Sequence, residues 1–450
     1  TDGKYVYTIS DKTVIIVRAW PTEKAGVIAK IELNGSPIGI FINGDKLVIF
    51  ERSGTYYGYY EEMWYSPYEY RTFIKVYDIK NRANPILVRN LSAEGTYISS
   101  RMIGDYVYVV IQQYVSWKEN EIMLPKIHSY DNVNETIPAT AIYYCNVSDH
   151  SYTFTTVLSI NVRNDKEKHT YTTLLLGDAS HMYVSINNIY ITVTKWDYKG
   201  QYTSKTLLYR IHIKGAELEL VASGEVPGTV LNQFSMDEYN GYFRIATTIG
   251  HVWDKKQLSK NNIYVLDLNL NIVSALTDLA PGERIYSARF MGERCYLVTF
   301  KKVDPFFVID LKNPNCPKVL GELKITGYSD YLHPYYKNYV IGIGKETVDV
   351  GDFAWYQGVK ISVFDVKVVS DPKELAKYVI GDRGTDSPVL HDHKAILVDS
   401  SKQILVIPIL LAEINKSQYP NPTPSTYGEY VWQGAYVFDL SLEGGLILKG

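Results

Sequence analysis

Residues 281–334 read PGERIYSARFMGERCYLVTFKKVDPFFVIDLKNPNCPKVLGELKITGYSDYLHP, and this stretch decides the fold. Four runs rich in β-branched and aromatic residues follow one another, at 285–291, 294–300, 306–311 and 318–325. Glycine, asparagine and proline separate the runs, and these residues favour turns over a continuing ladder. The stretch therefore predicts four antiparallel strands. A sheet of this size cannot bury both of its faces alone, so it needs neighbours of the same kind.

The same unit recurs along the whole chain. A tight turn followed by an apolar run marks its second strand, and this cue begins near residues 2, 43, 103, 186, 239, 291, 337 and 392. A further apolar strand follows each cue, and several end in Asp and a proline turn, as in YDIKNRANP and IDLKNPNCP. The mean spacing of about 56 residues exceeds the ~40–50 of common propeller repeats, and insertions account for the difference. We therefore expect an all-β fold, an eight-bladed β-propeller of four-stranded antiparallel blades.

The repeats divide the chain without any linker between them, so we expect a single β-propeller domain over residues 1–450. The approximate blades are 1–35, 36–95, 96–178, 179–228, 229–283, 284–327, 328–385 and 386–450. The first repeat lacks its opening strand. We expect that strand to come from residues before Thr1 or from the C-terminus, because an open strand edge is prone to pair with other chains.

The bulk composition restricts the classes of function. The chain has 450 residues, 46% hydrophobic and 21% charged, with a net charge of -3, which is ordinary for a soluble chain with a core. A charge so close to zero gives no reason to expect a nucleic-acid partner. No apolar run reaches the ~18 residues of a membrane-spanning helix. No signal peptide opens the chain, and its first residues read as a strand, so we expect a mature or truncated start.

The chain contains 40 tyrosines, which predicts an aromatic surface in addition to an aromatic core. Many lie in a hairpin insertion between Glu51 and Thr72. The residues that we expect to form this interaction loop are Tyr56, Tyr57, Tyr59, Tyr60, Trp64, Tyr65, Tyr68 and Tyr70. Exposed aromatic residues on a long loop favour contact with a protein partner, a second copy of the chain or a sugar. The alternative is a loop that folds over its own blade and buries these rings.

Glycosylation and disulfide bonding are the covalent modifications that the sequence indicates. Asn-x-Ser/Thr acceptors fall in predicted turns or insertions, at Asn34, Asn90, Asn134, Asn146 and Asn415. The three cysteines are Cys145, Cys295 and Cys316, and an odd count is not a disulfide framework. Cys295 and Cys316 lie in one blade and could pair. The alternative is a buried thiol on a strand and an unpaired cysteine in a turn.

Polar residues on the first strands of several repeats are candidates for lining a central channel, since the innermost strand of each propeller blade faces the axis. Arg101 and Arg289 occupy the same repeat position, three residues before the turn glycine. The corresponding strands of other repeats carry Asp237, Glu238, His333 and His391. These groups could hold an ion, a water or a small anion. Alternatively, each arginine pairs with a carboxylate of a neighbouring blade, as a buried arginine requires.

The segment 381–394, GDRGTDSPVLHDHK, concentrates residues with metal-binding chemistry. The candidate ligands are Asp382, Asp386, Asp392, His391 and His393. The first two aspartates flank a glycine-containing loop and could bind a hard cation such as calcium. The two histidines alternate, so on a strand they would face one side and could bind zinc or copper. The alternative is that these side chains bond to turn amides.

No motif identifies a reaction. The chain has no Gly-x-Ser-x-Gly elbow and no phosphate-binding glycine loop before a helix. A His-Asp-Ser arrangement has no support from spacing. Paired acids for glycoside hydrolysis stay open, since some propellers are glycosidases.

Five long segments carry a resemblance to a known family: 99–110 (SSRMIGDYVYVV), 221–248, 281–311, 327–335 (GYSDYLHPY) and 381–398. They resemble the secreted β-propeller-domain proteins of archaea and bacteria, which are described as distantly related to WD40 propellers. The resemblance covers nearly the whole chain in family order and implies an exported or cell-surface propeller with no established reaction. Two features depart from the family: the segment before TDGKY is absent, and Cys316 stands at a turn position where a polar residue is expected.

These observations favour a secreted or cell-surface propeller without enzymatic activity, acting as a scaffold, an adhesion module or a subunit of a surface assembly. We expect its partners to be other surface proteins, copies of itself or glycans, with the aromatic loops as the contacts. No cofactor follows from the sequence apart from calcium in the 381–394 segment. The alternative function is a secreted hydrolase that acts on polysaccharide or peptide at one face of the ring.

Overall fold

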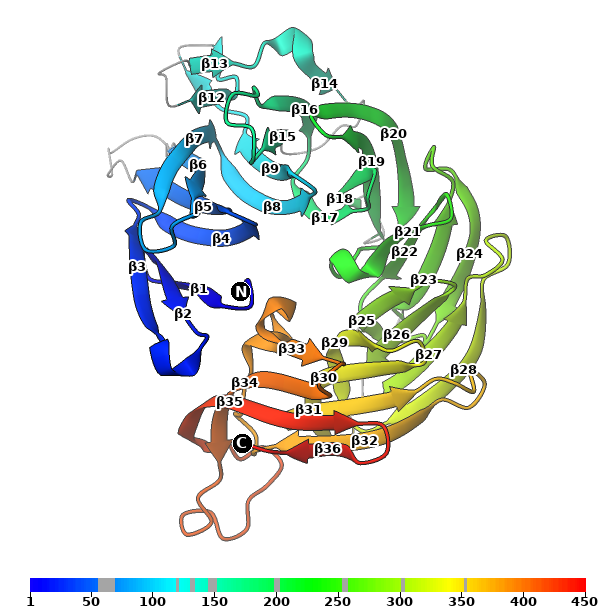
Figure 1. Cartoon of the computed structure of the whole chain (residues 1–450). Helices are drawn as coiled ribbons and strands as arrows, with labels where there is room; N and C mark the ends of the chain where they lie inside the picture. Colours follow the sequence, from blue (N-terminus) through cyan, green and yellow to red (C-terminus); the bar gives the residue numbers. More distant parts are fainter. Residues whose placement is uncertain are drawn as a thin grey trace, which may run out of the picture. The chain divides into compact units, whose positions relative to one another are not determined.

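The computed structural model describes residues 1–55, 69–118, 121–129, 134–144, 152–197, 203–252, 258–300, 304–351 and 354–450. Strands dominate these residues, and the helical segments among them are short 3-10 turns (Figure 1). By internal contacts the chain divides into two compact units. Unit 1 comprises Thr1–Lys195 and Leu207–Ser223, and unit 2 comprises Trp196–Thr206 and Gly224–Gly450.

The first three repeats form three sheets in unit 1. The first sheet has the order β1 (Tyr5–Ser10), β2 (Thr13–Arg18) and β3 (Gly26–Glu32). The second contains β4 (Ser36–Asn43), β5 (Lys46–Thr55), β6 (Glu69–Asp78) and β7 (Ile86–Glu94), followed at its edge by β12 (Lys126–Ser129) and β13 (Asn134–Thr136). The third contains β8 (Thr96–Ile103), β9 (Tyr106–Tyr114), β15 (Thr153–Asn161) and β16 (Thr170–Leu176), with β14 (Ile142–Tyr144) parallel at its edge. A small hairpin joins β10 (Trp117–Lys118) to β11 (Glu121–Ile122).

Each of the remaining repeats forms a four-stranded sheet in sequence order. The fourth sheet contains β17 (Ala179–Val184), β18 (Asn188–Asp197), β19 (Thr203–Lys214) and β20 (Glu217–Pro227). The fifth contains β21 (Met236–Tyr239), β22 (Tyr242–Ile249), β23 (Lys260–Leu266) and β24 (Ile272–Leu279). The sixth contains β25 (Arg284–Met291), β26 (Arg294–Phe300), β27 (Asp304–Asp310) and β28 (Lys318–Ile325).

The last two sheets complete unit 2. The seventh contains β29 (Tyr328–Tyr335), β30 (Tyr339–Asp349), β31 (Ala354–Asp365) and β32 (Lys373–Ile380). The eighth contains β33 (Leu397–Asp399), β34 (Ile404–Glu413), β35 (Glu429–Ser441) and β36 (Gly445–Leu448). The 3-10 turns are η1 (Thr22–Lys24), η2 (Ala139–Ala141), η3 (Gln233–Ser235), η4 (Pro388–Leu390) and η5 (His393–Ala395). With one sheet for each repeat, the fold is the predicted eight-bladed β-propeller.

A left-handed glycine makes the turn that marks the second strand of many repeats. Gly104 between β8 and β9 has φ +55°, and Gly292 between β25 and β26 has φ +58°. A side chain at such a φ is strained, so glycine is the residue that closes this two-residue turn at least cost. The sequence cue used to find the repeats is therefore a direct consequence of the turn geometry.

Hydrophobic residues pack between consecutive sheets, as the repeat argument requires. In unit 2, Phe306 of β27 and Phe364 of β31 stack with ring centroids 4.4 Å apart, and both are fully buried. On the next interface Ile341 of β30 packs in one cluster with Leu405 of β34. Burying a side chain of this size contributes about 1.5–3 kcal/mol. This packing holds the strand ends that form the site described below.

The insertion of the third repeat extends the sheet of the second repeat. Strand β12 from this insertion pairs antiparallel with β7, for example Ile127 with Ala93. Ile127 and Ile137 are fully buried in the core cluster of these two sheets. The long insertion is thus partly ordered by its own packing.

Two local predictions were wrong. Residues 391–396, predicted as the start of a strand, form η5 and its flanks, and the strand that follows is only Leu397–Asp399. Asn90 was placed in a turn but lies within β7, paired with Lys75 of β6. Its side-chain oxygen is buried. A strand position of this kind is a poor place for a glycan, which needs an open turn.

Candidate functional site

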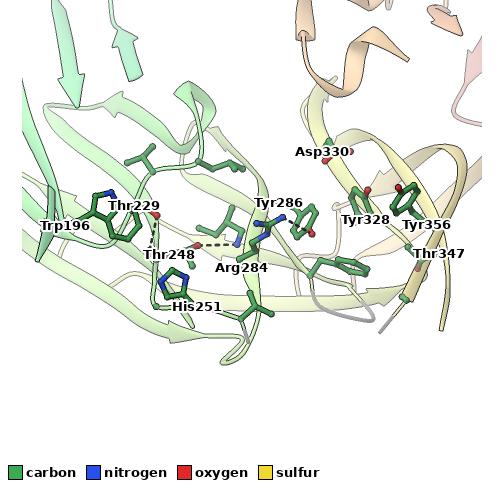
Figure 2. Close-up of a pocket in the computed structure, with 17 residues that line it drawn as sticks. Trp196, Thr229, Thr248, His251, Arg284, Tyr286, Tyr328, Asp330, Thr347 and Tyr356 are labelled. Carbon is green, nitrogen blue, oxygen red and sulfur yellow. Dashed lines mark hydrogen bonds between the residues drawn. The ribbon is translucent and has the colours of Figure 1, made fainter. Parts of the chain in front are cut away.

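A cavity of about 800 Å³ opens in unit 2 and is lined by strand ends of four consecutive sheets (Figure 2). It lies at the ends of β18, β22, β26 and β30 and at the starts of β25, β29 and β31. Hairpin pairing places these positions together, since Arg284 is opposite Phe300 and Tyr328 is opposite Lys345. Its volume falls within the ~300–1,000 Å³ of small-molecule sites.

Three aromatic rings form one wall of the cavity. The ring centroids of Tyr286 and Tyr328 are 4.8 Å apart, and Phe300 lies 5.3 Å from Tyr286 and 5.0 Å from Tyr328. The guanidinium of Arg284 stacks 4.8 Å above the Tyr286 ring and donates to its hydroxyl at 3.2 Å. Mutual packing of this kind holds the rings in fixed orientations.

A second aromatic surface lies on the other side of the cavity. The indole of Trp196 stacks parallel to the imidazole of His251, with centroids 6.5 Å apart and planes 4° apart. Trp196 keeps 42% of its surface exposed. Figure 2 shows the pair together with Thr229 and Thr248, away from Tyr328 and Asp330. The cavity is therefore lined by aromatic rings at both ends.

Arg383 fixes the position of Tyr356, which lines the same cavity. The guanidinium of this buried arginine lies 4.3 Å from the ring centroids of Trp355, Tyr356 and Tyr427. It donates to the Tyr356 carbonyl at 2.9 Å and to the Tyr427 hydroxyl at 3.0 Å. The hydroxyls of Tyr356 and Tyr427 are 3.1 Å apart. A planar guanidinium suits this stacked position in a way that a lysine ammonium does not.

Asp330, on β29, is the only acidic residue among the described residues that line the cavity. It is half-buried, and no hydrogen bond or ion pair joins its carboxyl to any residue within the described part of the chain. Burial raises the pKa of its carboxyl to about 7, with Asp386 adding to the rise and Lys345 and Arg284 opposing it. A carboxyl with a pKa in this range is a common feature of functional sites.

The neighbouring cations have other partners. The Lys345 ammonium donates to the Thr385 carbonyl and lies 3.4 Å from an Asp386 carboxylate oxygen. Burial lowers the pKa of Lys345 although both Asp386 and Asp330 oppose that effect. The carboxyl oxygens of Asp330, which line the cavity, can therefore still accept hydrogen bonds from a ligand.

The predicted channel residues of unit 2 are partly brought together. Arg289 lies 4.7 Å from the Phe234 ring, and its charge acts on His333. Burial first, then Arg289 and His393, lower the pKa of His333 to about 4. The His333 Nδ1 is 3.0 Å from the Tyr331 hydroxyl. His333 is therefore neutral at physiological pH, which weakens any role as an anion ligand.

Asp237 forms an arginine–carboxylate pair within its own sheet, whereas the predicted alternative was a pair between neighbouring blades. Asp237 pairs with the buried Arg244 on the adjacent strand, with Arg244 Nε 3.0 Å from Asp237 Oδ2. Arg244 Nη1 also donates to the Gly292 carbonyl of the next sheet at 2.7 Å. Arg101 lies on β8 of unit 1 and donates to the Ser100 carbonyl at 2.8 Å. Burial lowers its pKa.

The last two channel candidates lie on different elements. Glu238 lies half-buried on β21, and His391 is exposed at the end of η4.

The predicted metal site is not assembled. No group of three or more His, Cys, Asp or Glu side chains with metal-binding geometry occurs within the described ranges. Asp382 accepts from the Ile414 amide at 2.8 Å, and Asp392 accepts from the Lys394 amide at 3.0 Å. Asp386 faces Lys345. Asp382 and Asp392 thus bond to backbone amides, as in the alternative interpretation, and the His393 ring packs on Phe234 with centroids 4.8 Å apart.

The predicted disulfide is not formed. Cys295 is buried on β26 and Cys316 is exposed in the turn before β28, and both are free. Burial raises the pKa of the Cys295 thiol strongly. The alternative of a buried thiol and an unpaired turn cysteine is correct.

Several predicted residues lie outside the described residues: Tyr56, Tyr57, Tyr59, Tyr60, Trp64, Tyr65, Tyr68, Cys145 and Asn146. Tyr70, the remaining member of the interaction loop, is 38% exposed on β6. Asn34, Asn134 and Asn415 are exposed. No helix in the described ranges has the length and apolar character needed to cross a membrane.

Sequence reasoning missed Asp330, Tyr328 and Arg383 as residues of the candidate site. A weak signal was present for the first two, because GYSD places an aromatic residue and an acid two apart at a strand start. Such residues point to one side of a strand. Arg383 was passed over in favour of the acids on either side of it in GDRGTD.

Comparison with known proteins identifies the family of this chain, and the relatives described below have no assigned activity. The model of the family described as "Beta propeller domain" matches residues 1–450. An uncharacterised protein of Methanocaldococcus jannaschii is 52% identical over 188 residues, which are 42% of this chain and 28% of that protein. An uncharacterised protein of Archaeoglobus fulgidus is 43% identical over 201 residues, 44% of this chain and 30% of that protein. The matched stretches thus span less than a third of these relatives.

Similar solved structures are distant. A chain from a Saccharomyces cerevisiae structure containing Dbp5, Nup159 and Gle1 has 8% identity and a TM-score of 0.37, covering 91% of this chain and 84% of that chain. A hypothetical selenium-binding protein from Sulfolobus tokodaii has 11% identity and a TM-score of 0.31, covering 82% and 89%.

Proposed function

This chain belongs to the beta propeller domain family, and we propose that it is a carbohydrate-binding adhesion module without enzymatic activity, working at the cell surface or in the medium. The observation that carries the proposal is the cavity of unit 2, which is lined by five aromatic rings and by one carboxyl that has no partner among the described residues. The rings belong to Trp196, Tyr286, Phe300, Tyr328 and Tyr356.

Sugars match both parts of this lining. The C–H faces of a pyranose ring are apolar and pack on flat aromatic rings, while its hydroxyls at the ring edge need polar partners. Asp330 offers two oxygens, and the exposed His251 imidazole offers a further polar group at the opposite end. A ligand that fills both ends would contact the rings and the carboxyl together. The aromatic insertion expected as an interaction loop would add to the same chemistry elsewhere on the chain.

The experiment is a screen of oligosaccharides followed by isothermal titration calorimetry. We expect binding of at least one saccharide class, and a loss of about tenfold or more for Trp196→Ala, since a stacked ring contributes about 1–3 kcal/mol. Trp117→Ala is the matched control, because Trp117 is 56% exposed in unit 1 and does not line the cavity. The proposal would be refuted if both variants lost the same saccharide affinity, or if the native protein bound no saccharide.

A hydrolase is the second candidate, and one observation favours it. A carboxyl that keeps its proton near pH 7, as Asp330 does, can act as a general acid. Glycoside hydrolysis needs a second carboxylate about 5–10 Å away, and Asp330 is the one acid among the described lining residues. Reducing-end release from bound oligosaccharides, lost in Asp330→Asn, would favour the hydrolase over the binding module.

A further inference from the structure

We propose that the unit 2 cavity selects saccharides that carry a free amine, with the Asp330 carboxylate and the surrounding aromatic rings receiving the ammonium group. This inference rests on the proposed function, because it names the class of sugar that the same cavity takes. Three features of the cavity support it: Asp330 has no partner among the described residues, the cations near Asp330 already have partners of their own, and aromatic rings lie beside it.

The first feature is that the Asp330 carboxyl has no partner among the residues that the structure describes. A half-buried carboxylate is costly unless it is paired or hydrogen-bonded. Among the described residues no donor contacts Asp330, although it lies at the start of a well-packed strand whose neighbour Ser329 is fully buried. A ligand donor is the group that would complete this site.

The second feature concerns the charges that face Asp330. They are Arg284 on β25, Lys345 on β30 and Asp386 in the segment after β32. Lys345 and Asp386 pair with each other, so together they leave little net charge. Arg284 donates a hydrogen bond to the Tyr286 hydroxyl, and because its guanidinium is exposed, salt in solution screens its charge. A cationic group of a ligand would therefore be attracted by the Asp330 carboxylate and only weakly repelled by the neighbouring cations.

The third feature is the set of rings beside the acid. Tyr286, Phe300 and Tyr328 pack within 5.3 Å of one another, and Tyr356 lines the same end of the cavity in Figure 2. Aromatic faces attract ammonium groups through their quadrupole, more strongly where water is excluded. A carboxylate with rings around it is a combination that favours an ammonium over a neutral acetamide or an acidic sugar.

Binding of an amine should be linked to the protonation of Asp330. Its pKa of about 7 means that the free protein holds a proton on this carboxyl in mildly acidic solution. An ammonium within ~4–6 Å lowers a carboxyl pKa by about 1–3 units, so binding at pH 6 releases a proton. Affinity for the amine sugar should then rise up to about tenfold per pH unit between pH 5.5 and 7, whereas affinity for a neutral sugar should not change in this way.

The test measures three tetrasaccharides by titration calorimetry on the full chain at pH 6: glucosamine, N-acetylglucosamine and galacturonate oligomers. We expect the glucosamine tetramer to bind at least tenfold more tightly than the acetylated one, with proton release seen as a dependence on buffer ionisation enthalpy. Asp330→Asn should remove both the preference and the proton release. Asp371→Asn should keep both, since it removes the same charge from an exposed turn.

The outcomes separate the inference from the function on which it rests. Equal binding of the neutral and amine tetramers, or tighter binding of the galacturonate tetramer, overturns the amine selectivity and leaves sugar binding standing. An amine preference that survives in Asp330→Asn overturns the role of this acid. Binding of none of the sugars overturns the proposed function itself.

Discussion

Replacing Asp330 by Asn should stabilise the protein at neutral and basic pH, and the gain should depend on pH. Asn keeps the shape of the side chain and removes its titration. The folded-state pKa of about 7 lies roughly 3 units above the ordinary aspartate pKa of 3.8. At 1.36 kcal/mol per unit this is at most about 4 kcal/mol, and water in the open cavity reduces it to about 2–3 kcal/mol.

The sign follows from proton counting. Between about pH 4 and pH 7 the folded native protein holds a proton on Asp330 that the unfolded chain has released, so native stability falls as the pH rises through this window. The Asn variant lacks this loss. It should therefore match the native protein near pH 4 and exceed it by about 2–3 kcal/mol at pH 8.

The assay is urea denaturation followed by tryptophan fluorescence at pH 4, 6 and 8, with Asp371→Asn as the exposed-acid control. The difference between native and Asp330→Asn midpoints should open between pH 4 and 8, while the control shows no such trend. A difference that is constant with pH, or one that favours the native protein at pH 8, would refute the assignment of Asp330 as an unpartnered carboxyl.

Three further predictions follow from the described contacts. Arg244→Leu should destabilise the protein by about 3–5 kcal/mol in urea denaturation, because it leaves a carboxylate without its buried partner; a loss under 1 kcal/mol would contradict the pairing. Arg383→Lys should weaken saccharide binding severalfold in calorimetry with a small change in unfolding midpoint, because Lys cannot stack on three rings; unchanged affinity would argue against its positioning role. In a Cys145→Ser background, a thiol reagent should label Cys316 at once and Cys295 only after unfolding, and rapid labelling of both would contradict the burial of Cys295.

The fold could be predicted from the sequence because its determinants are local and repeated. A turn glycine such as Gly292 and the apolar run that follows it lie within ten residues, and the cue recurs along the chain. In two places the repeat pattern predicted the strands wrongly, because contacts outside the repeat decide the local structure there. The eighth sheet begins with a strand of three residues because η4 and η5 replace most of the expected strand. The β12 strand joins the sheet of another repeat, which no local pattern indicates.

The candidate site could not be predicted, because it is made of single residues from separate repeats. Tyr286, Tyr328 and Tyr356 are spread over 70 residues, and each looks like an ordinary strand residue in its own repeat. The unusual property of Asp330, a carboxyl without a partner among the described residues, depends on which side chains surround it in space. The acids of the 381–394 segment predicted a metal site. The residue of this segment that supports the cavity is instead Arg383, which donates to the Tyr356 carbonyl.

A crystal structure of the full chain with the tightest-binding oligosaccharide would test saccharide binding in this cavity most directly. We expect a sugar ring packed on Trp196 or on the Tyr286–Tyr328 wall, with a ligand donor within about 3 Å of an Asp330 carboxylate oxygen. A saccharide bound elsewhere on the chain, with this cavity holding only water, would contradict this expectation.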